Sequence, residues 1–373
     1  MLISAILILT LAGCTSAERG VPEGTEAPET ERLQALVEQL QADHNIPGLS
    51  VAIATGTGEP VVAGAGLADR DRKIEVTPDT MFFLGSVAKN IFATVALRLV
   101  DQGRLDLESP LSEFVPWPRG EEITIRMLLN HTSGIPDYLS RDLFAAARDG
   151  GIPEFFRTHR TPADLLATIP DRAPIFDPGN RQDYSNTNGL LVGEVIRKLT
   201  GKPLTALLDE QIVHTLGLRQ MYLYGESTAE RHRARGYSGA ANWGAAEGEP
   251  ADCSSADEAL PDSADGSVVA SAGDLLRYHR ALRQGGLLSE TSWTAMSTVQ
   301  PGFHNGLGYL LADGPFGPVQ GNLGRSMGHV AANLYYLDLD AYVVILSNRS
   351  DVPLPLEPLL EQWFGVEKNE DRQ

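Results

Sequence analysis

Apolar residues in the first hundred residues recur at spacings that alternate between helical and extended periods. Leucines and a valine three and four residues apart predict an amphipathic helix over roughly 31–43. Two short apolar runs, which begin at Leu49 and Val61 and have Gly and Pro between them, are typical of paired strands. An apolar stretch from Phe82 leads into a second, more buried helix that ends at Gly103. This part of the chain therefore combines strands with helices.

The middle of the chain, from about 105 to 270, has a different pattern, with helical periodicity broken by Pro- and Gly-rich loops. The elements expected there and beyond are helices at 165–169, 190–199, 274–282 and 356–363 and strands near 308–311, 332–337 and 341–346. This order predicts an α/β (α+β) fold, with an α/β sheet domain formed by 31–104 and 268–365 and an inserted, mostly helical domain at 105–267. A functional site is expected in the cleft between the two domains.

Composition narrows the class of protein. Of the 373 residues, 42% are apolar and 21% are charged, which is typical of a globular protein. Acidic residues outnumber basic ones by 49 to 30, and the net charge of −19 disfavours nucleic-acid binding because it repels phosphate. Two cysteines are too few for a disulfide framework. The sequence also lacks the close histidine and carboxylate pairs of a metal centre, so we expect no metal and no cofactor.

The N-terminal residues are predicted to direct export. Residues 2–11 are almost wholly apolar but too short to span a bilayer, so residues 1–13 suit a signal peptide. The run ends in Leu-Ala-Gly-Cys14, which resembles a bacterial lipobox and implies cleavage before Cys14 and lipidation of its thiol. Residues 14–30 are polar and typical of a flexible tether. We expect a lipoprotein anchored in a bacterial membrane and facing the periplasm or the cell exterior. An ordinary secretory signal is the alternative, and no Lys or Arg precedes the apolar run.

A Ser-x-x-Lys sequence, Ser86-Val-Ala-Lys89, begins the second helix. A serine hydroxyl is a poor nucleophile until a neighbouring base takes its proton, and a buried lysine can act as that base. The spacing places Lys89 one turn beyond Ser86 on the same helix face. In isolation, a helix-start serine followed by a surface lysine is the better interpretation of this pattern. Its position after an apolar strand and Gly85 favours a nucleophile with its activating partner.

A second triplet, Tyr184-Ser-Asn186, follows a Pro-Gly turn and is therefore expected on a loop. Tyr and Asn residues in loops commonly pack and cap, which is the alternative interpretation. Beside a serine–lysine pair, the Tyr184 phenol could exist as a phenolate and relay a proton to the leaving group.

A third stretch, Gly328-His329-Val-Ala331-Ala332, opens an apolar strand near the C-terminus. Backbone N–H groups at a strand edge can hold a developing oxyanion. His329 is placed to orient a substrate carboxylate or to relay a proton, although a single histidine is more often structural.

Together, the S-x-x-K, Y-x-N and H-x-A sequences resemble the serine β-lactamase and penicillin-recognising DD-peptidase superfamily, in particular its class C, DD-carboxypeptidase and esterase branch. The stretches at 128–135, 266–272 and 306–309 also resemble that family. The resemblance covers roughly residues 31 to 365. It implies a β-lactamase/transpeptidase-like fold, in which an antiparallel sheet is flanked by helices and carries an inserted mostly-α domain.

The resemblance also implies a role for each candidate site residue. Ser86 would be the acylated nucleophile and Lys89 its activating partner. Tyr184 would be the catalytic phenol, and Asn186 would hold the substrate amide. The Asn-His-Thr-Ser-Gly stretch at 130–134 would be structural and shape the entry to the helical domain.

In the third motif, the resemblance implies that the backbone N–H groups of Ser86 and Ala332 form the oxyanion hole and that His329 binds substrate. The motif usually ends in Gly, and here that position is Ala331, whose methyl group could crowd the acyl site. A histidine at 329, where efficient β-lactamases have lysine, is more typical of DD-peptidases and esterases.

The function expected from these residues is that of a serine hydrolase which works through an acyl-enzyme. Its substrates would be D-amino-acid peptides or small esters and amides, as for a D-alanyl-D-alanine carboxypeptidase or an esterase. A class C-like β-lactamase is one alternative, and a non-catalytic penicillin-binding-type protein is another. The expected partners are a small-molecule or peptide substrate and, through the lipid anchor, a membrane.

Overall fold

The computed structural model describes residues 27–139, 161–169, 171–225, 233–239, 250–258, 262–299, 303 and 305–369. The predicted leader, Cys14 and the tether as far as residue 26 lie outside the described residues. Within those ranges, no helix is both long enough and apolar enough to cross a membrane.

The largest element of the fold is a seven-stranded antiparallel sheet to which both ends of the chain contribute. In spatial order its strands are β3 (Ile74–Glu75), β2 (Val61–Asp69), β1 (Gly48–Thr55), β12 (Ala341–Ser347), β11 (Val330–Tyr336), β10 (Gly317–Arg325) and β9 (Leu310–Gly314). The two ends of the chain meet where β1 pairs with β12. These two central strands are covered on both faces, which explains why each is a continuous apolar run in the sequence.

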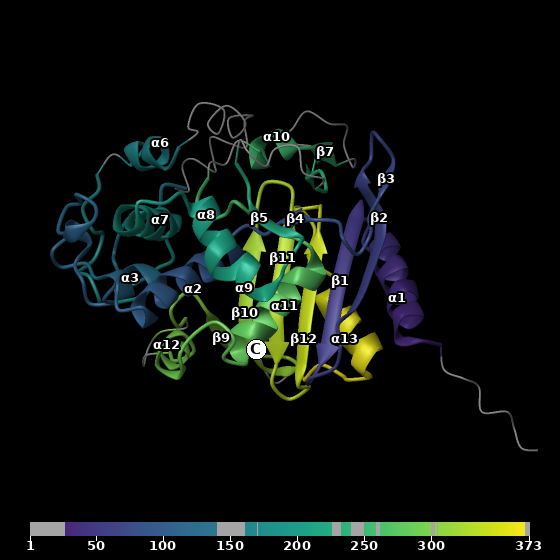
Figure 1. Cartoon of the computed structure of the whole chain (residues 1–373). Coiled ribbons are helices and arrows are strands. Elements are labelled where there is room, and N and C mark those ends of the chain that lie inside the picture. The colour runs from purple at the N-terminus through teal and green to yellow at the C-terminus, as the bar shows by residue number, and fades with distance from the viewer. Residues whose placement is uncertain are drawn as a thin grey trace, which may run out of the picture.

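Helices cover both faces of this sheet. Figure 1 shows α1 (Glu29–Asp43) and α13 (Leu356–Phe364) on one side and α11 (Ala272–Arg283) on the other. The side chains of β11 alternate between the two cores. Ala332 packs with residues of α1 and α13, whereas Ala331 packs with residues of α11.

Helix α2 (Val87–Asp101) connects the sheet to the helical part of the molecule. Every residue from Val87 to Leu97 is buried, and a helix that is apolar on nearly all sides is stable only in such surroundings. Its start is held in place because strand β4 (Phe82–Phe83), just before it, pairs with β8 (Val268–Ala270). Ser86, which lies between β4 and α2, therefore has little freedom to move.

Among the other helices, α3, α6 and α7 lie on the side of α2 away from α1 in Figure 1. The other described helices are α3 (Ile125–Leu129), α6 (Pro162–Ala167), α7 (Asn186–Thr200), α8 (Leu204–Leu208), α9 (His214–Leu216), α10 (Ser254–Asp257), α12 (Glu290–Met296) and the short turns at Leu111–Glu113 and Asp209–Val213. Strand β5 (Met221–Leu223) completes a three-stranded sheet with β4 and β8, and β6 (Tyr237–Ser238) pairs with β7 (Ala251–Asp252).

The predicted fold class is confirmed, since an antiparallel sheet is flanked by helices and mostly helical segments lie between its two halves in the sequence. Two strands of the sheet, the two-residue β3 and the longer β10, were not predicted. The sequence of β10, GPVQGNLGR, contains three glycines and a proline and lacks the apolar alternation that marks a strand. This omission has a direct consequence for the active site, because β10 is the strand that lies against Ser86.

Stability at acid pH should depend on His279 of α11, which is fully buried, with its Nε2 2.8 Å from Tyr309 OH. Burial, with a smaller effect of Arg283, lowers the pKa of His279 from 6.5 to about 3. Between these two values the unfolded chain binds more protons than the folded one, so stability falls as the pH falls through this window. We expect His279→Gln, which keeps an amide near Tyr309 but does not titrate, to flatten the slope by roughly 1 kcal/mol per pH unit. Urea unfolding across this pH window measures the slope, and an unchanged slope would contradict the assignment.

Candidate active site

Ser86 is the N-cap residue of α2, but its hydroxyl makes no capping hydrogen bond to the helix. The oxygen therefore remains available to other groups. Gly85, immediately before it, has a φ of +52°, and a Cβ there would lie 2.7 Å from the backbone nitrogen of Arg325. Only glycine permits this approach, which holds the start of α2 against β10.

Lys89 lies one turn further along α2, and its side chain is almost fully buried. Its Nζ donates hydrogen bonds to the backbone carbonyl of Asp265 at 2.7 Å, to Asn186 Oδ1 at 2.9 Å and to Ser86 Oγ at 3.3 Å. In the part of the chain that the structure describes, no carboxylate forms an ion pair with this group. Three neutral oxygens thus replace the water around the amine and fix it beside Ser86.

Tyr184 lies on the loop before α7, and Asn186 begins that helix. The Tyr184 hydroxyl is 2.8 Å from Ser86 Oγ and donates to Asn186 Oδ1 at 3.3 Å. Because the Tyr184 hydroxyl hydrogen is donated to Asn186 Oδ1, the Ser86 hydroxyl is the donor in the bond between Ser86 and the phenolic oxygen. The Ser86 proton therefore points toward Tyr184. The structure brings together these four residues, which are up to a hundred positions apart in the sequence.

Asp137 is a site residue that sequence analysis missed. Its Oδ2 accepts a hydrogen bond of 2.9 Å from Asn186 Nδ2, which turns the Asn186 oxygen toward Lys89 and Tyr184. Burial raises the pKa of the Asp137 carboxyl, and the hydrogen bonds from Leu139 and Asn186 oppose this shift. Asp137 follows the family-like His-Thr-Ser-Gly stretch by three residues, but only the fold shows that it contacts Asn186.

Asp265 is a second residue that was missed, because it acts through a backbone carbonyl that has no sequence signature. Its carboxylate accepts hydrogen bonds from Tyr138 OH at 2.6 Å and from the Ser263 hydroxyl. Burial and the neighbouring Asp265 raise the pKa of Tyr138 well above its usual value, so this phenol stays a donor. These two bonds fix the loop that presents the carbonyl to Lys89.

The structure corrects the position of the third motif. A Cβ at Gly324 of β10 would collide with the carbonyl of Leu84 and lie 3.0 Å from the backbone nitrogen of Ser86. Strand β10 therefore lies against the start of α2, and β11 is one strand further away. The triplet next to Ser86 is Asn322-Leu-Gly324, which ends in glycine. The expected departure from the family at Ala331 is therefore wrong.

The predicted oxyanion-hole role of Ala332 is also wrong. Ala332 lies on a strand with paired neighbours on both sides, so its peptide groups serve the sheet. Just beyond β10, the Ser326 N–H donates to the His329 carbonyl, so it points toward β11. Successive N–H groups along a strand point to opposite edges, so the Arg325 N–H points away from β11. Gly85 lies on that side. The N–H groups that meet at this edge are those of Ser86 and Arg325.

His329 does not face the site opening. Its ring is 1% exposed and lies close to Phe82 and Phe83, with ring centroids 6.1 and 5.6 Å away. Its Nε2 is 3.3 Å from the backbone carbonyl of Ala234. A ring enclosed in this way cannot contact a substrate, so the predicted substrate-binding role of His329 is wrong.

A pair of substitutions tests which strand flanks the nucleophile. The methyl group of Gly324→Ala must displace β10 or Leu84, so we expect covalent labelling by a fluorophosphonate to slow about a hundredfold. Ala331→Gly, one strand away, should label at nearly the wild-type rate and lose only roughly 1 kcal/mol of stability. Thermal unfolding of both variants separates misfolding from a local effect. A larger loss of labelling in Ala331→Gly would mean that β11, and not β10, flanks Ser86.

Known proteins share this fold and parts of this sequence. Esterase EstB of Burkholderia gladioli is 35% identical over 197 residues, which is 50% of each protein. Penicillin-binding protein 4* of Bacillus subtilis is 26% identical over 344 residues, covering 86% of this chain and 72% of that protein. This chain spans about half the length of several curated relatives that it matches.

Among solved structures, a D-stereospecific amidohydrolase from Streptomyces sp. superimposes with a TM-score of 0.75 at 27% identity, covering 91% of this chain and 100% of that one. The sequence matches the Beta-lactamase family over residues 33–360, which is most of its length. On these grounds, the chain belongs to the β-lactamase family.

Proposed function

We propose that this protein is a serine hydrolase that forms an acyl-enzyme on Ser86 and acts on D-amino-acid peptides or on small esters and amides. One observation carries the proposal: Ser86 Oγ is hydrogen-bonded both to Lys89 Nζ and to Tyr184 OH. A serine becomes nucleophilic when a neighbouring group can take its proton. Here the proton already points toward such a group.

Acylation and hydrolysis both follow from this arrangement. In the reacting state Tyr184 has released its own proton and is a phenolate beside the cationic Lys89, so the pair can accept one proton. Ser86 Oγ bonds to the substrate carbonyl carbon while its proton passes to the Tyr184 oxygen. The alcohol or amine that leaves takes up this proton as its bond to the carbonyl breaks. A water molecule then attacks the acyl group, gives a proton to the same pair, and Oγ recovers it as the product acid departs. In both steps the carbonyl oxygen becomes negative and accepts hydrogen bonds from the N–H groups of Ser86 and Arg325.

The free edge of β10 supports an extended amide or ester as substrate. Among the described strands, β9 pairs with β10 only as far as Gly321, which leaves one edge unpaired from Asn322 to Arg325. Leu323 is 55% exposed on this segment, which favours a substrate with an apolar group. The D-amino-acid class rests on the Streptomyces relative, whose name states D-stereospecificity, and the ester class on EstB.

Two substitutions test the nucleophile and its partner. Ser86→Ala should abolish fluorophosphonate labelling, because no other residue is proposed to be acylated. Lys89→Ala should slow labelling at least about a thousandfold, since cooperating groups fail together when either is lost. Lys202→Ala is the matched control, because Lys202 is exposed and pairs with Glu210, and it should label at the wild-type rate. Labelling that survives in folded Ser86→Ala would remove Ser86 from the mechanism.

The substrate class is tested by following benzylpenicillin, a short-chain ester and a D-amino-acid amide with the same protein. We expect the ester and the D-amide to turn over, and the L-amide to react at least about tenfold more slowly. Intact-protein mass spectrometry should show benzylpenicillin as a slowly released adduct on Ser86. Rapid loss of benzylpenicillin without an adduct would instead identify a β-lactamase. Failure of the ester and of both amides would contradict the proposed substrates.

A further inference from the structure

The segment after α3 contains a buried histidine, His131, that contacts the chain on both sides of Tyr184. Its backbone carbonyl accepts the N–H of Asp183 at 2.9 Å, and its Nδ1 accepts the N–H of Ser185 at 3.4 Å. Its ring lies on the ring of Tyr184, with centroids 4.5 Å apart and planes 36° apart. Three different contacts from one residue therefore restrain Tyr184.

A second donor fixes the tautomer of this ring. Asn188 Nδ2 lies 3.1 Å from His131 Nδ1, while Asn188 Oδ1 accepts from the Ser133 hydroxyl at 2.7 Å. Two N–H groups that point at Nδ1 require it to be an acceptor, so the ring hydrogen is on Nε2. Burial, helped by the charge of Lys89, lowers the pKa of His131 to about 3. The ring is therefore neutral when Tyr184 works at ordinary pH.

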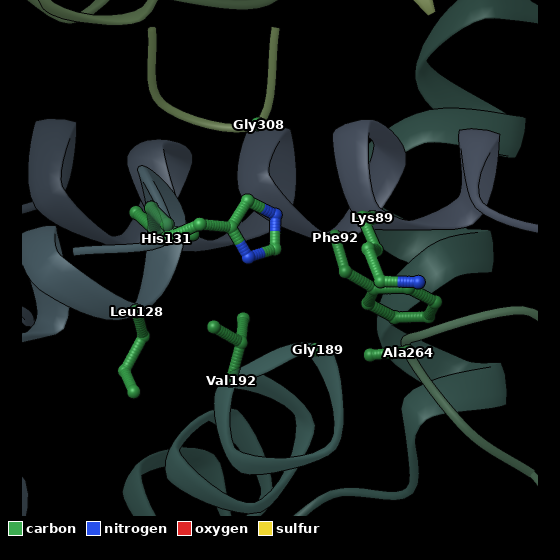
Figure 2. A pocket seen from close by; sticks show the side chains of 9 residues that line it. Lys89, Phe92, Leu128, His131, Gly189, Val192, Ala264 and Gly308 are labelled. Carbon is green, nitrogen blue, oxygen red and sulfur yellow. The ribbon is translucent and has the colours of Figure 1, made fainter. Parts of the chain in front are cut away.

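The backbone of His131 is also unusual. Its φ is +60°, a conformation that Asn and Asp adopt more readily than most other residues with a side chain. The ring borders a cavity of about 20 Å³ together with Lys89, Val192 and Gly308, and Figure 2 shows the ring and Lys89 on opposite sides of it. A cavity of this size holds about one water molecule. It also leaves some room for a substituted side chain.

We propose that His131 is a positioning residue for Tyr184, which it holds at hydrogen-bonding distance from Ser86 through Nδ1, its carbonyl and its ring. The inference deepens the proposed function, because it rests on Tyr184 as the group that takes the Ser86 proton. His131 itself takes no proton in this scheme. An error of about 1 Å in the place of a catalytic group can cost a hundredfold in rate, which sets the effect expected when these contacts are lost.

Two substitutions separate the contacts. His131→Phe keeps a ring against Tyr184 but removes the acceptor, and labelling of Ser86 by a fluorophosphonate should slow about a hundredfold. His131→Asn places its Oδ1 where Nδ1 was and suits the positive φ, so labelling should stay within about tenfold of wild type. His131→Gln, which reaches the Nε2 position and leaves Nδ1 unfilled, replaces the Phe variant if that variant does not fold.

The matched controls are His279→Phe and His279→Asn, since His279 is equally buried but lies on α11. Both should label at close to the wild-type rate in proportion to folded protein. Hydrogen exchange of the Ser185 amide is a readout that does not need activity. It should be protected in wild type and in His131→Asn, and it should exchange at least about tenfold faster in His131→Phe.

Several outcomes would overturn the proposal. The first is a His131→Phe variant whose Ser86 is labelled at the wild-type rate. The second is a folded His131→Asn variant whose Ser86 is labelled as slowly as that of the Phe variant. A third concerns the dependence of the labelling rate on pH. If the wild-type rate falls on the acid side near neutral pH and this fall disappears in His131→Asn, His131 exchanges protons itself. If wild-type protein is not labelled at Ser86, the proposed function fails, and the exchange of Ser185 then decides the positioning role alone.

Discussion

The active site is organised around one buried amine. Lys89 is nearly excluded from water, and its three hydrogen bonds go to neutral oxygens from three separate segments, which are the start of α2, the start of α7 and the loop before β8. Hydrogen bonds to a charged group contribute about 1.5–3 kcal/mol each, and a lost partner leaves the group with an unmet desolvation cost. None of the three segments can move away without this penalty. The need to solvate Lys89 with protein oxygens therefore fixes where Ser86 and Asn186 lie.

The segment from His131 to Tyr138 holds two of these three segments in place, which are the start of α7 and the loop before β8. Asp137 orients Asn186, Tyr138 binds the carboxylate of Asp265, and His131 restrains Tyr184. Each contact is made by a buried or half-buried polar group, and such groups are costly unless their hydrogen bonds are complete. This explains why a stretch that looked only structural in the sequence lies directly behind the catalytic residues. This stretch forms a second layer that holds Asn186, Tyr184 and the Asp265 loop in position.

Sequence analysis predicted Ser86 and Lys89 from local spacing, and Tyr184 and Asn186 from the resemblance to a known family. Ser86 and Lys89 are one helical turn apart, so a helix was enough to bring them together. The third motif was placed on β11 because the H-x-A sequence opens that mostly apolar strand, which is easy to recognise. The strand that flanks Ser86 is β10, where glycine is needed for close contact with α2 and where no described strand pairs with one edge from Asn322 to Arg325. The constraints that suit β10 to the site are thus the same ones that remove its strand pattern.

The buried polar groups around Lys89 and the exposed side chains next to Ser86 differ in what they can contribute to substrate selectivity. The polar groups around Lys89 bind mainly to one another, so they can serve any carbonyl that reaches Ser86 and carry little information about the rest of the substrate. The exposed positions are different, since Leu323 and Tyr184 are 55% and 47% exposed and lie on segments that border Ser86. Differential contact with a substrate is what separates the rates of competing substrates. The proteins similar to this chain are named as an esterase, a penicillin-binding protein and a D-stereospecific amidohydrolase. Under the proposed function, the exposed side chains at the free edge of β10 would set the selectivity, and the groups around Lys89 would carry out the chemistry.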